Sequence, residues 1–149
     1  MTIRRARIKD VDAIGAIISA AYAHYVERIG RRPGPMEDDH LGRVVRGEAF
    51  VAEDGGHTVG TVVLVDAADH LVLTNLAVDP AHQHRGLGRA LLAFAEDEAR
   101  RRGFRVVRLW THVTMTENLA LYARLGYVEE DRRPERVFLA KDLGGASLS

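Results

Sequence analysis

Cysteine is absent from this sequence of 149 residues, which excludes disulfide bonds, thiolate nucleophiles and zinc–thiolate sites. Long apolar runs are absent too. No stretch approaches the ~18 apolar residues of a membrane span, and the N-terminal MTIRRARIKD has no apolar signal-peptide core. Neither sign of charge is in excess, because 21 basic residues balance 21 acidic ones, so we expect neither nucleic acid nor a membrane as partner. These absences together predict a cytoplasmic protein in a reducing compartment.

Metal-binding spacings are also missing. The histidines show neither H-x-x-x-H nor H-E-x-x-H on any predicted helix, so we expect no metal site. What is present is an ordinary globular composition, with 46% hydrophobic and 28% charged residues. A chain of this length suits one domain with its own core, which we place at residues 1–143. The segment GGASLS, residues 144–149, is predicted to be a disordered tail.

Hydrophobic periodicity predicts an α+β fold. Strands are expected at 2–8, 49–54, 58–66, 71–78, 105–110, 127–131 and 137–140, and helices at 11–29, 36–47, 87–102 and 114–125. Asp10 is expected to cap the first helix, and Thr114 with Glu117 has the spacing of a capping box for the last one. The strand–helix–strand order from residue 71 to 110 implies a right-handed crossover, which makes those two strands parallel within a mixed sheet.

A glycine loop, QHRGLGRA, lies between the apolar strand at 71–78 and the long helix at 87–102. Gly86 and Gly88 would let an anion approach the free amides at the start of the helix, and Arg85 and Arg89 add positive charge, so a diphosphate is the expected guest. The loop lacks the lysine of a P-loop and the third glycine of a dinucleotide fingerprint. It matches [RQ]-x-x-G-x-[GA], the pyrophosphate loop of acetyl-coenzyme A enzymes. Tight packing at a helix start is the alternative explanation for the two glycines.

Two segments together, LAVDPAHQHRGLGRALL and TENLALYARLGY, resemble the GNAT superfamily of N-acetyltransferases in their order and spacing. The resemblance covers roughly residues 2–143, and RPGPM and MTENLALYARLGY are similar to a small bacterial subset of that family. It implies a GNAT-like three-layer fold, in which a mixed, mostly antiparallel sheet with a splayed central pair of parallel strands has helices on both faces. It also implies an acyltransferase that uses acetyl-coenzyme A as co-substrate. Dimers are common in the family, so a homodimer is considered as well.

The resemblance implies roles for particular residues. Groups of the strand at 71–78 and of the glycine loop would hold coenzyme A, namely Leu76, Ala77, Val78, Gln83, His84, Arg85, Gly86, Leu87, Gly88 and Arg89. Tyr122 would protonate the departing thiolate, although its helix face alone indicates an ordinary core tyrosine. Asn118, one turn earlier, would touch the coenzyme in place of an asparagine that many relatives carry where this chain has Met115, or would merely help the helix begin.

The general base is not evident from the sequence. Neither splayed strand contains a carboxylate, so His112 at the end of the second strand is a candidate, and proton loss through ordered water is the alternative. Thr74 and Asn75 are the only polar residues of the strand at 71–78, which makes them candidates for the acceptor site. Further candidates, beside the charged segment at 31–40, are Tyr22, Tyr25 and Arg31.

The sequence therefore predicts an N-acetyltransferase that moves an acetyl group from acetyl-coenzyme A to a primary amine. Direct attack in a ternary complex is expected, because no cysteine is present to carry the group. The acceptor would be a small-molecule amine or a peptide amine. Two alternatives stay open. One is a catalytically weak coenzyme A-binding sensor or interaction module, which the missing carboxylate favours, and the other is a transferase for longer acyl chains or protein N-termini.

Overall fold

The computed structural model describes residues 1–144, so the predicted tail lies outside the described residues apart from Gly144. The strands are β1 (Thr2–Arg5), β2 (Ala49–Asp54), β3 (His57–Asp66), β4 (Leu71–Val78), β5 (Val106–His112), β6 (Val128–Arg132) and β7 (Arg136–Asp142). The helices are α1 (Val11–Tyr22), α2 (Tyr25–Ile29), α3 (His40–Val45), α4 (Leu87–Arg101) and α5 (Thr116–Arg124). No helix within residues 1–144 is both long and apolar enough to cross a membrane.

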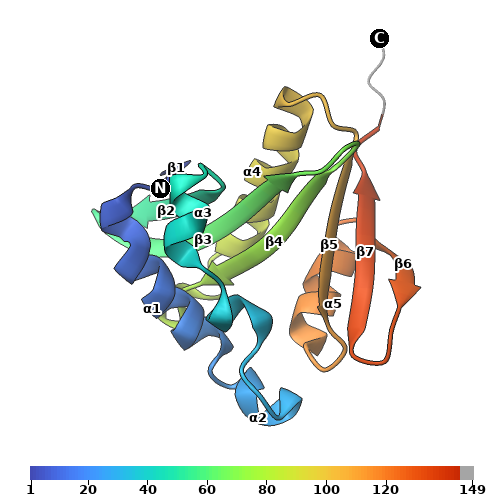
Figure 1. The fold of residues 1–149 in the computed structure, drawn as a ribbon, viewed down its shortest axis with the longest axis horizontal. Coiled ribbons are helices and arrows are strands. Elements are labelled where there is room, and N and C mark those ends of the chain that lie inside the picture. The colour runs from blue at the N-terminus through green and yellow to red at the C-terminus, as the bar shows by residue number, and fades with distance from the viewer. Residues whose placement is uncertain (145–149) are drawn as a thin grey trace.

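The strands form one sheet in the order β1-β2-β3-β4-β5-β7-β6 (Figure 1). Within residues 1–144 every neighbouring pair is antiparallel except β4 and β5, which are parallel. That pair is joined only near its start, where Leu71 lies opposite Val107 and Val72 lies opposite Arg108. Beyond these residues the two strands separate, so the sheet opens into a V (Figure 1). The predicted mixed sheet with a splayed parallel pair is confirmed.

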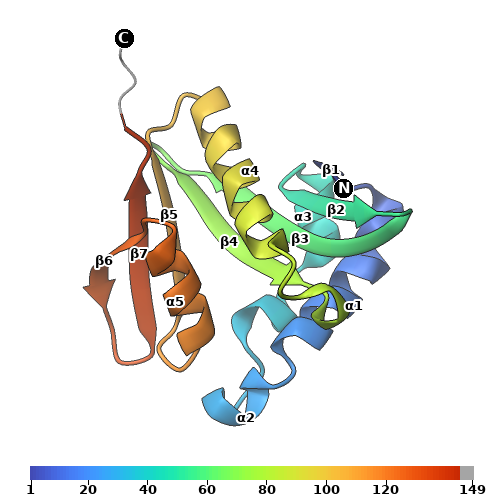
Figure 2. The same cartoon turned by 180° about the vertical axis from the view of Figure 1, so that it is seen from behind.

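Helices cover both faces of the sheet, as predicted. From one face α1 packs on β3 and β4 with α3 beside it, and from the other face α4 packs on the same strands, with α5 next to β5 (Figures 1 and 2). The buried stripe of α4 includes Leu91, Leu92, Ala95 and Ala99. Burial of each leucine contributes about 1.5–3 kcal/mol, so this packing fixes where α4 begins relative to the end of β4.

β4 contains a bulge. Val63 of β3 pairs with Asn75, and the next residue along β3 pairs with Leu73, so Thr74 has no partner across the ladder. The extra residue reverses the sidedness of the strand, because Leu73 packs in the cluster under α4 whereas Ala77 packs in the cluster under α1. A regular strand would place both residues on one face. The bulge thereby turns Asn75 toward the α1 face of the sheet.

The start of the chain differs from its prediction in two ways. The apolar spacing through Ile29 predicted one helix, but the chain turns after Tyr22 and separates α1 from α2. Asp10 precedes α1 without capping it, because its carboxylate accepts hydrogen bonds from the Arg4 guanidinium at 2.8 and 3.0 Å and from the Arg7 amide at 2.7 Å. The hydrogen bonds from Arg4 lower the pKa of Asp10. An ion pair with β1 has therefore replaced a local cap.

The predicted capping box at Thr114 and Glu117 is wrong. α5 begins later than predicted, and no side chain within residues 1–144 caps it. Thr114 Oγ1 lies 2.9 Å from His112 Nδ1, while the Glu117 carboxylate accepts two hydrogen bonds from Arg28, at 2.7 and 3.1 Å. Thr114 is thus engaged by a residue two positions earlier, and Glu117 by a residue distant in sequence. The helix predicted at 36–47 is likewise shortened to α3.

Candidate active site

Two cavities lie beside the splayed strands. The first, named the loop cavity, measures about 500 Å³ and is bounded by the glycine loop, the end of β4 and facing residues of α1 and α5. The second, named the splay cavity, measures about 210 Å³ and is bounded by the bulged part of β4, the end of β5 and the segment after α2. Tyr22, Leu76 and Asn118 line both cavities. Molecules bound in the two cavities would therefore meet at these three side chains.

The glycine loop forms one wall of the loop cavity. Gly86 precedes α4 with a φ of 79°, a left-handed conformation that glycine adopts without strain. Because no side chain of residues 1–144 caps α4, the amides of its first turn are free to bind an anion. A Cβ on Gly88 would lie 3.4 Å from Leu121 Cδ2, so a larger residue there would project into the space between α4 and α5. This cradle has the geometry that a diphosphate requires.

The charges around the loop cavity also suit a phosphorylated ligand. Arg89 and Arg124 line it, and neither forms an ion pair with a carboxylate of residues 1–144. Glu117 is the carboxylate among the described lining residues, and Arg28 already neutralises it. Hydrogen bonds from Arg28 lower the pKa of Glu117 to about 2, so the pair stays charged at neutral pH. The two remaining arginines are thus available for phosphate oxygens.

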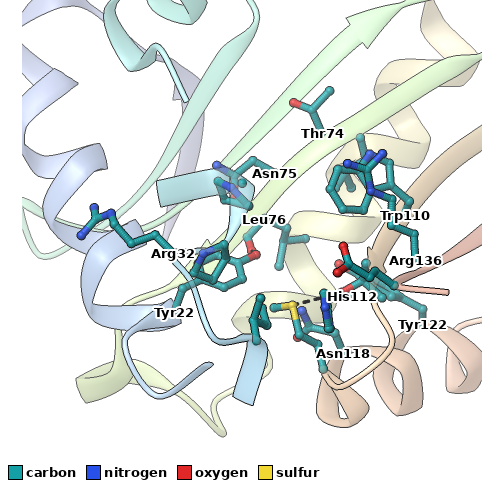
Figure 3. A pocket seen from close by; sticks show the side chains of 18 of the residues that line it. Tyr22, Arg32, Thr74, Asn75, Leu76, Trp110, His112, Asn118, Tyr122 and Arg136 are labelled. Carbon is teal, nitrogen blue, oxygen red and sulfur yellow. Dashed lines mark hydrogen bonds between the residues drawn. The ribbon is translucent and has the colours of Figure 1, made fainter. Parts of the chain in front are cut away.

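Unpartnered polar side chains line the splay cavity (Figure 3). Thr74 Oγ1 and both amide atoms of Asn75 are buried and have no hydrogen-bond partner among the described residues. Only 3% of Asn75 is exposed. A buried polar atom left without a partner costs about 1–3 kcal/mol, and such atoms are rare in native proteins. The three atoms are therefore placed to bind a ligand.

Two buried tyrosines lie where the cavities meet. Tyr122 lines the splay cavity, and burial raises the pKa of its hydroxyl, so this group stays protonated at neutral pH. Tyr22 donates a hydrogen bond from its hydroxyl to the Leu76 carbonyl at 2.9 Å, and burial raises its pKa as well. The side chain of Tyr22 is thus fixed against β4, whereas Tyr122 forms no hydrogen bond through its hydroxyl with residues 1–144.

His112 lies at the end of β5 and also lines the splay cavity (Figure 3). Its Nδ1 accepts a hydrogen bond from the Thr114 backbone N–H at 3.2 Å. A backbone amide can only donate, so Nδ1 holds a lone pair and the neutral ring carries its proton on Nε2. The neutral ring therefore has a hydrogen-bond donor, and no lone pair, at Nε2.

Charged residues surround the splay cavity, and these are Arg31, Arg32, Glu135 and Arg136. Arg31 binds Glu135 at 2.9 Å, and Arg32 binds Glu37 at 2.6 Å. Arg136 forms no ion pair with a carboxylate of residues 1–144. Instead, its guanidinium stacks on the Trp110 ring, 4.4 Å from the ring centroid (Figure 3).

Most of the residues predicted from the sequence line these two cavities. The predicted residues that line the loop cavity are Leu76, Ala77, Val78, Gln83, His84, Gly86, Leu87, Gly88, Arg89 and Asn118. Those that line the splay cavity are Tyr22, Arg31, Thr74, Asn75, His112 and Tyr122. Arg85 lines neither cavity. Tyr25, a candidate for the acceptor side, lines the loop cavity. Within residues 1–144 no three histidine, aspartate or glutamate side chains are grouped to hold a metal ion.

Sequence reasoning missed Trp110, Arg136 and Arg124. Arg136 reaches Trp110 because β5 pairs with β7, with His112 directly opposite Arg136, and no local pattern predicts that pairing. Trp110 is the only tryptophan of the chain and is 41% exposed, so its rarity was the one available signal. Arg124 follows Tyr122 by two residues in the motif that drew attention to the tyrosine, and this proximity could have identified it.

Comparison with known proteins identifies the family. Residues 16–127 match the acetyltransferase (GNAT) family. The [ribosomal protein bS18]-alanine N-acetyltransferase of Escherichia coli K12 is 43% identical over 82 residues, which are 54% of this chain and 54% of that protein, so the chain spans about half the length of the curated relatives it matches. The crystal structure of the E. coli ribosomal-protein-S18-alanine N-acetyltransferase has a TM-score of 0.79 at 26% identity, over 98% of this chain and 96% of that one. PaiA N-acetyltransferase of Thermoplasma acidophilum, in complex with coenzyme A, shares the fold with a TM-score of 0.81 at 20% identity, over 95% of this chain and 98% of that one. On this similarity, the chain belongs to the acetyltransferase (GNAT) family.

Proposed function

We propose that this protein moves an acetyl group from acetyl-coenzyme A to a primary amine. The observation that carries the proposal is the junction of the two cavities at Tyr22, Leu76 and Asn118. One cavity has free helix amides and arginines suited to phosphate, and the other has unpartnered polar atoms and a buried, protonated tyrosine. A coenzyme and an acceptor held in these cavities would meet in the way that direct transfer requires.

The loop cavity fits coenzyme A. The first amides of α4, from Leu87 onward, would bind the diphosphate, with Arg89 and Arg124 adding charge-assisted hydrogen bonds. Beyond Val72 the edge of β4 that faces β5 has no partner strand in the part of the chain that the structure describes, so its backbone groups are available to the amides of the pantetheine arm. When bound, acetyl-coenzyme A supplies the acetyl group as a thioester.

The splay cavity supplies the groups that handle protons. The transfer forms one N–C bond and breaks one C–S bond, while one proton leaves the amine and one proton reaches the sulfur. We assign the second proton to Tyr122, because its hydroxyl is protonated and lies beside the junction. We assign removal of the first proton to water, because the neutral His112 ring has no lone pair at Nε2. Tyr122 regains its proton from solvent.

The relatives bear on the acceptor. Those from E. coli are named for acetylating an alanine of a ribosomal protein, which supports an α-amine as the acceptor of this chain.

One observation favours the second candidate, a coenzyme-binding module with weak catalysis. Glu135 is the carboxylate among the described residues lining the splay cavity, and Arg31 binds it, so it is not free to act as a base.

The proposal is tested by following release of the coenzyme A thiol, with acetyl-coenzyme A and a panel of amines as substrates. We expect amine-dependent release in the wild type. We expect Tyr122→Phe to lower kcat by about a hundredfold, since positioned acids contribute about 10²–10⁴, with little change in the coenzyme Kd. Tyr127→Phe is the matched control, because Tyr127 is also buried but binds Glu96 and lines neither cavity. Equal kcat in wild type and Tyr122→Phe would exclude the acid role, and coenzyme binding without any amine-dependent release would favour the binding module.

A further inference from the structure

The splay cavity carries an excess of positive charge. Its described lining includes three arginines, Arg31, Arg32 and Arg136, but one carboxylate, that of Glu135. A cavity for a polycationic acceptor would need carboxylates to offset the acceptor's charges, and here the carboxylate is already bound by Arg31. The charge of the cavity therefore favours an acceptor that brings a negative charge of its own.

Arg136 is the arginine of this cavity that is left for a ligand. Arg31 and Arg32 are occupied by Glu135 and Glu37, whereas Arg136 has no carboxylate partner among residues 1–144. Stacking on Trp110 holds the guanidinium plane against the ring and leaves its N–H edge free. A guanidinium fixed in this way binds a carboxylate through two parallel hydrogen bonds. Arg136 thus offers a preformed carboxylate site at the start of β7.

Asn75 provides the second point of recognition. The residue is 3% exposed and lines the same cavity, and neither atom of its amide has a partner within the described residues. The amide oxygen accepts from an amine N–H, and the amide nitrogen donates to an oxygen. The bulge at Thr74 is what turns this side chain to the cavity, so the arrangement is a product of the fold and not of an exposed loop.

We propose that the acceptor is an amino acid, that is, a compact primary amine that carries a carboxylate. Its carboxylate would bind Arg136, and the polar atoms next to its amine would bind the Asn75 side chain. This inference rests on the proposed function and adds the substrate class to it. The cavity of about 210 Å³ is below the roughly 300–1,000 Å³ typical of sites for drug-sized ligands, which fits a molecule of amino-acid size. Polyamines and basic peptide N-termini are disfavoured, because Arg136 has no carboxylate partner among residues 1–144 and the Glu135 carboxylate is already bound by Arg31.

The test compares the twenty standard amino acids with their carboxamides, which keep the amine and side chain but lack the negative charge. We expect the wild type to prefer at least one amino acid over its amide by about tenfold or more in kcat/KM, the usual effect of a hydrogen bond to a charged group. Arg136→Gln should remove this preference by raising KM for the amino acid. Arg105→Gln is the matched control, because Arg105 also lacks a carboxylate partner within residues 1–144, lines neither cavity and lies about 20 Å away at the other end of β5.

A binding measurement without turnover accompanies the kinetics. Calorimetric titration of the preferred amino acid and its amide into the protein should show weaker binding of the amide by about tenfold, and no such difference in Arg136→Gln. Equal kcat/KM for acids and amides, or acetylation of a basic N-terminal peptide in preference to every amino acid, would overturn the acceptor class while leaving the transferase intact. Absence of turnover with every amine, in protein that still binds acetyl-coenzyme A, would overturn the proposed function as well.

Discussion

Asn75 and Thr61 are both buried polar residues of the sheet, but they differ in whether they have a partner. Thr61 is fully buried, and its hydroxyl donates to the Phe50 carbonyl at 2.8 Å. Asn75 is nearly as buried, and both atoms of its amide lack a partner among residues 1–144. The hydrogen bond of Thr61 stabilises the fold, whereas the unpaired polar atoms of Asn75 lower stability and are available to a ligand.

Substitution of the two residues should therefore have opposite effects on stability. Asn75→Leu, which keeps the branched shape of the side chain without its polar atoms, should raise the free energy of unfolding by about 1 kcal/mol, because it removes unpaired buried atoms. It should also raise KM for the acceptor. Thr61→Val should lower the free energy of unfolding by about 1 kcal/mol. Urea unfolding and initial rates measure both effects, and a large loss of stability in Asn75→Leu would mean that the amide is satisfied within the protein.

Individual residues of the site could be predicted from the sequence where they lie in a recognisable motif. Gly86 and Gly88 were identified from the spacing of the loop and Tyr122 from the resemblance to the GNAT family, and the structure places all three at the cavities. Trp110 and Arg136 meet only through pairing of β5 with β7, which joins residues that are far apart in the chain. The ion pair between Arg31 and Glu135 was equally unpredictable, since Glu135 lies in a turn that is far away along the chain.

Among the elements, α4 connects packing to binding. Its buried leucines fix it to the sheet, and its uncapped N-terminus faces the loop cavity. Gly88 lies in the first turn at a helical conformation, so a side chain there meets no backbone strain, unlike one at Gly86. Gly88 is therefore the better position at which to separate binding from folding.

Gly88→Val should weaken acetyl-coenzyme A binding by at least about tenfold, because its side chain would occupy the space that phosphate needs. Stability should stay within about 0.5 kcal/mol of the wild type, since valine is no worse than glycine within a helix. Ala93→Val, at an exposed position of α4 that lines neither cavity, is the control and should leave binding unchanged. Calorimetry gives both Kd values, and an unchanged Kd in Gly88→Val would place the diphosphate elsewhere.

Helices and strands were predictable where the local sequence pattern alone determined them. β4 covers residues 71–78 as predicted, because a nearly continuous apolar run bounded by polar residues indicates a covered strand. The break between α1 and α2 was not predictable, since no proline or glycine marks it and the apolar spacing runs through it. The bulge at Thr74 was hidden for the same reason, because it arises from the register with β3.

At the scale of the whole molecule, the chain forms two halves that are joined at one end by β4 and β5. At the open end, two ion pairs among the described residues connect the halves, namely Arg28 with Glu117 and Arg31 with Glu135. Hydrogen bonds from the arginines lower the pKa of both carboxyl groups, so both pairs are charged at neutral pH. These exposed pairs contribute little to global stability, but they restrict how far the halves move apart.

The double variant Arg28→Gln, Arg31→Gln should keep the urea midpoint of the wild type and increase amide hydrogen exchange in α2 and α5. In about 1 M salt the wild type should approach the variant, because the pairs are screened. The control is Arg100→Gln, Arg132→Gln, which breaks two exposed pairs that each lie within one element. Exchange that rises equally in control and variant, or in neither, would show that the two pairs do not restrain the opening.

The separation of β4 from β5 leaves a row of peptide groups inside the sheet without a neighbouring strand. Such a row can bind any molecule whose shape and hydrogen-bond spacing match its own. An extended compound with two amides and an anionic end group would compete with the coenzyme there. Inhibitors of this protein can therefore be designed from backbone geometry before its natural acceptor is known.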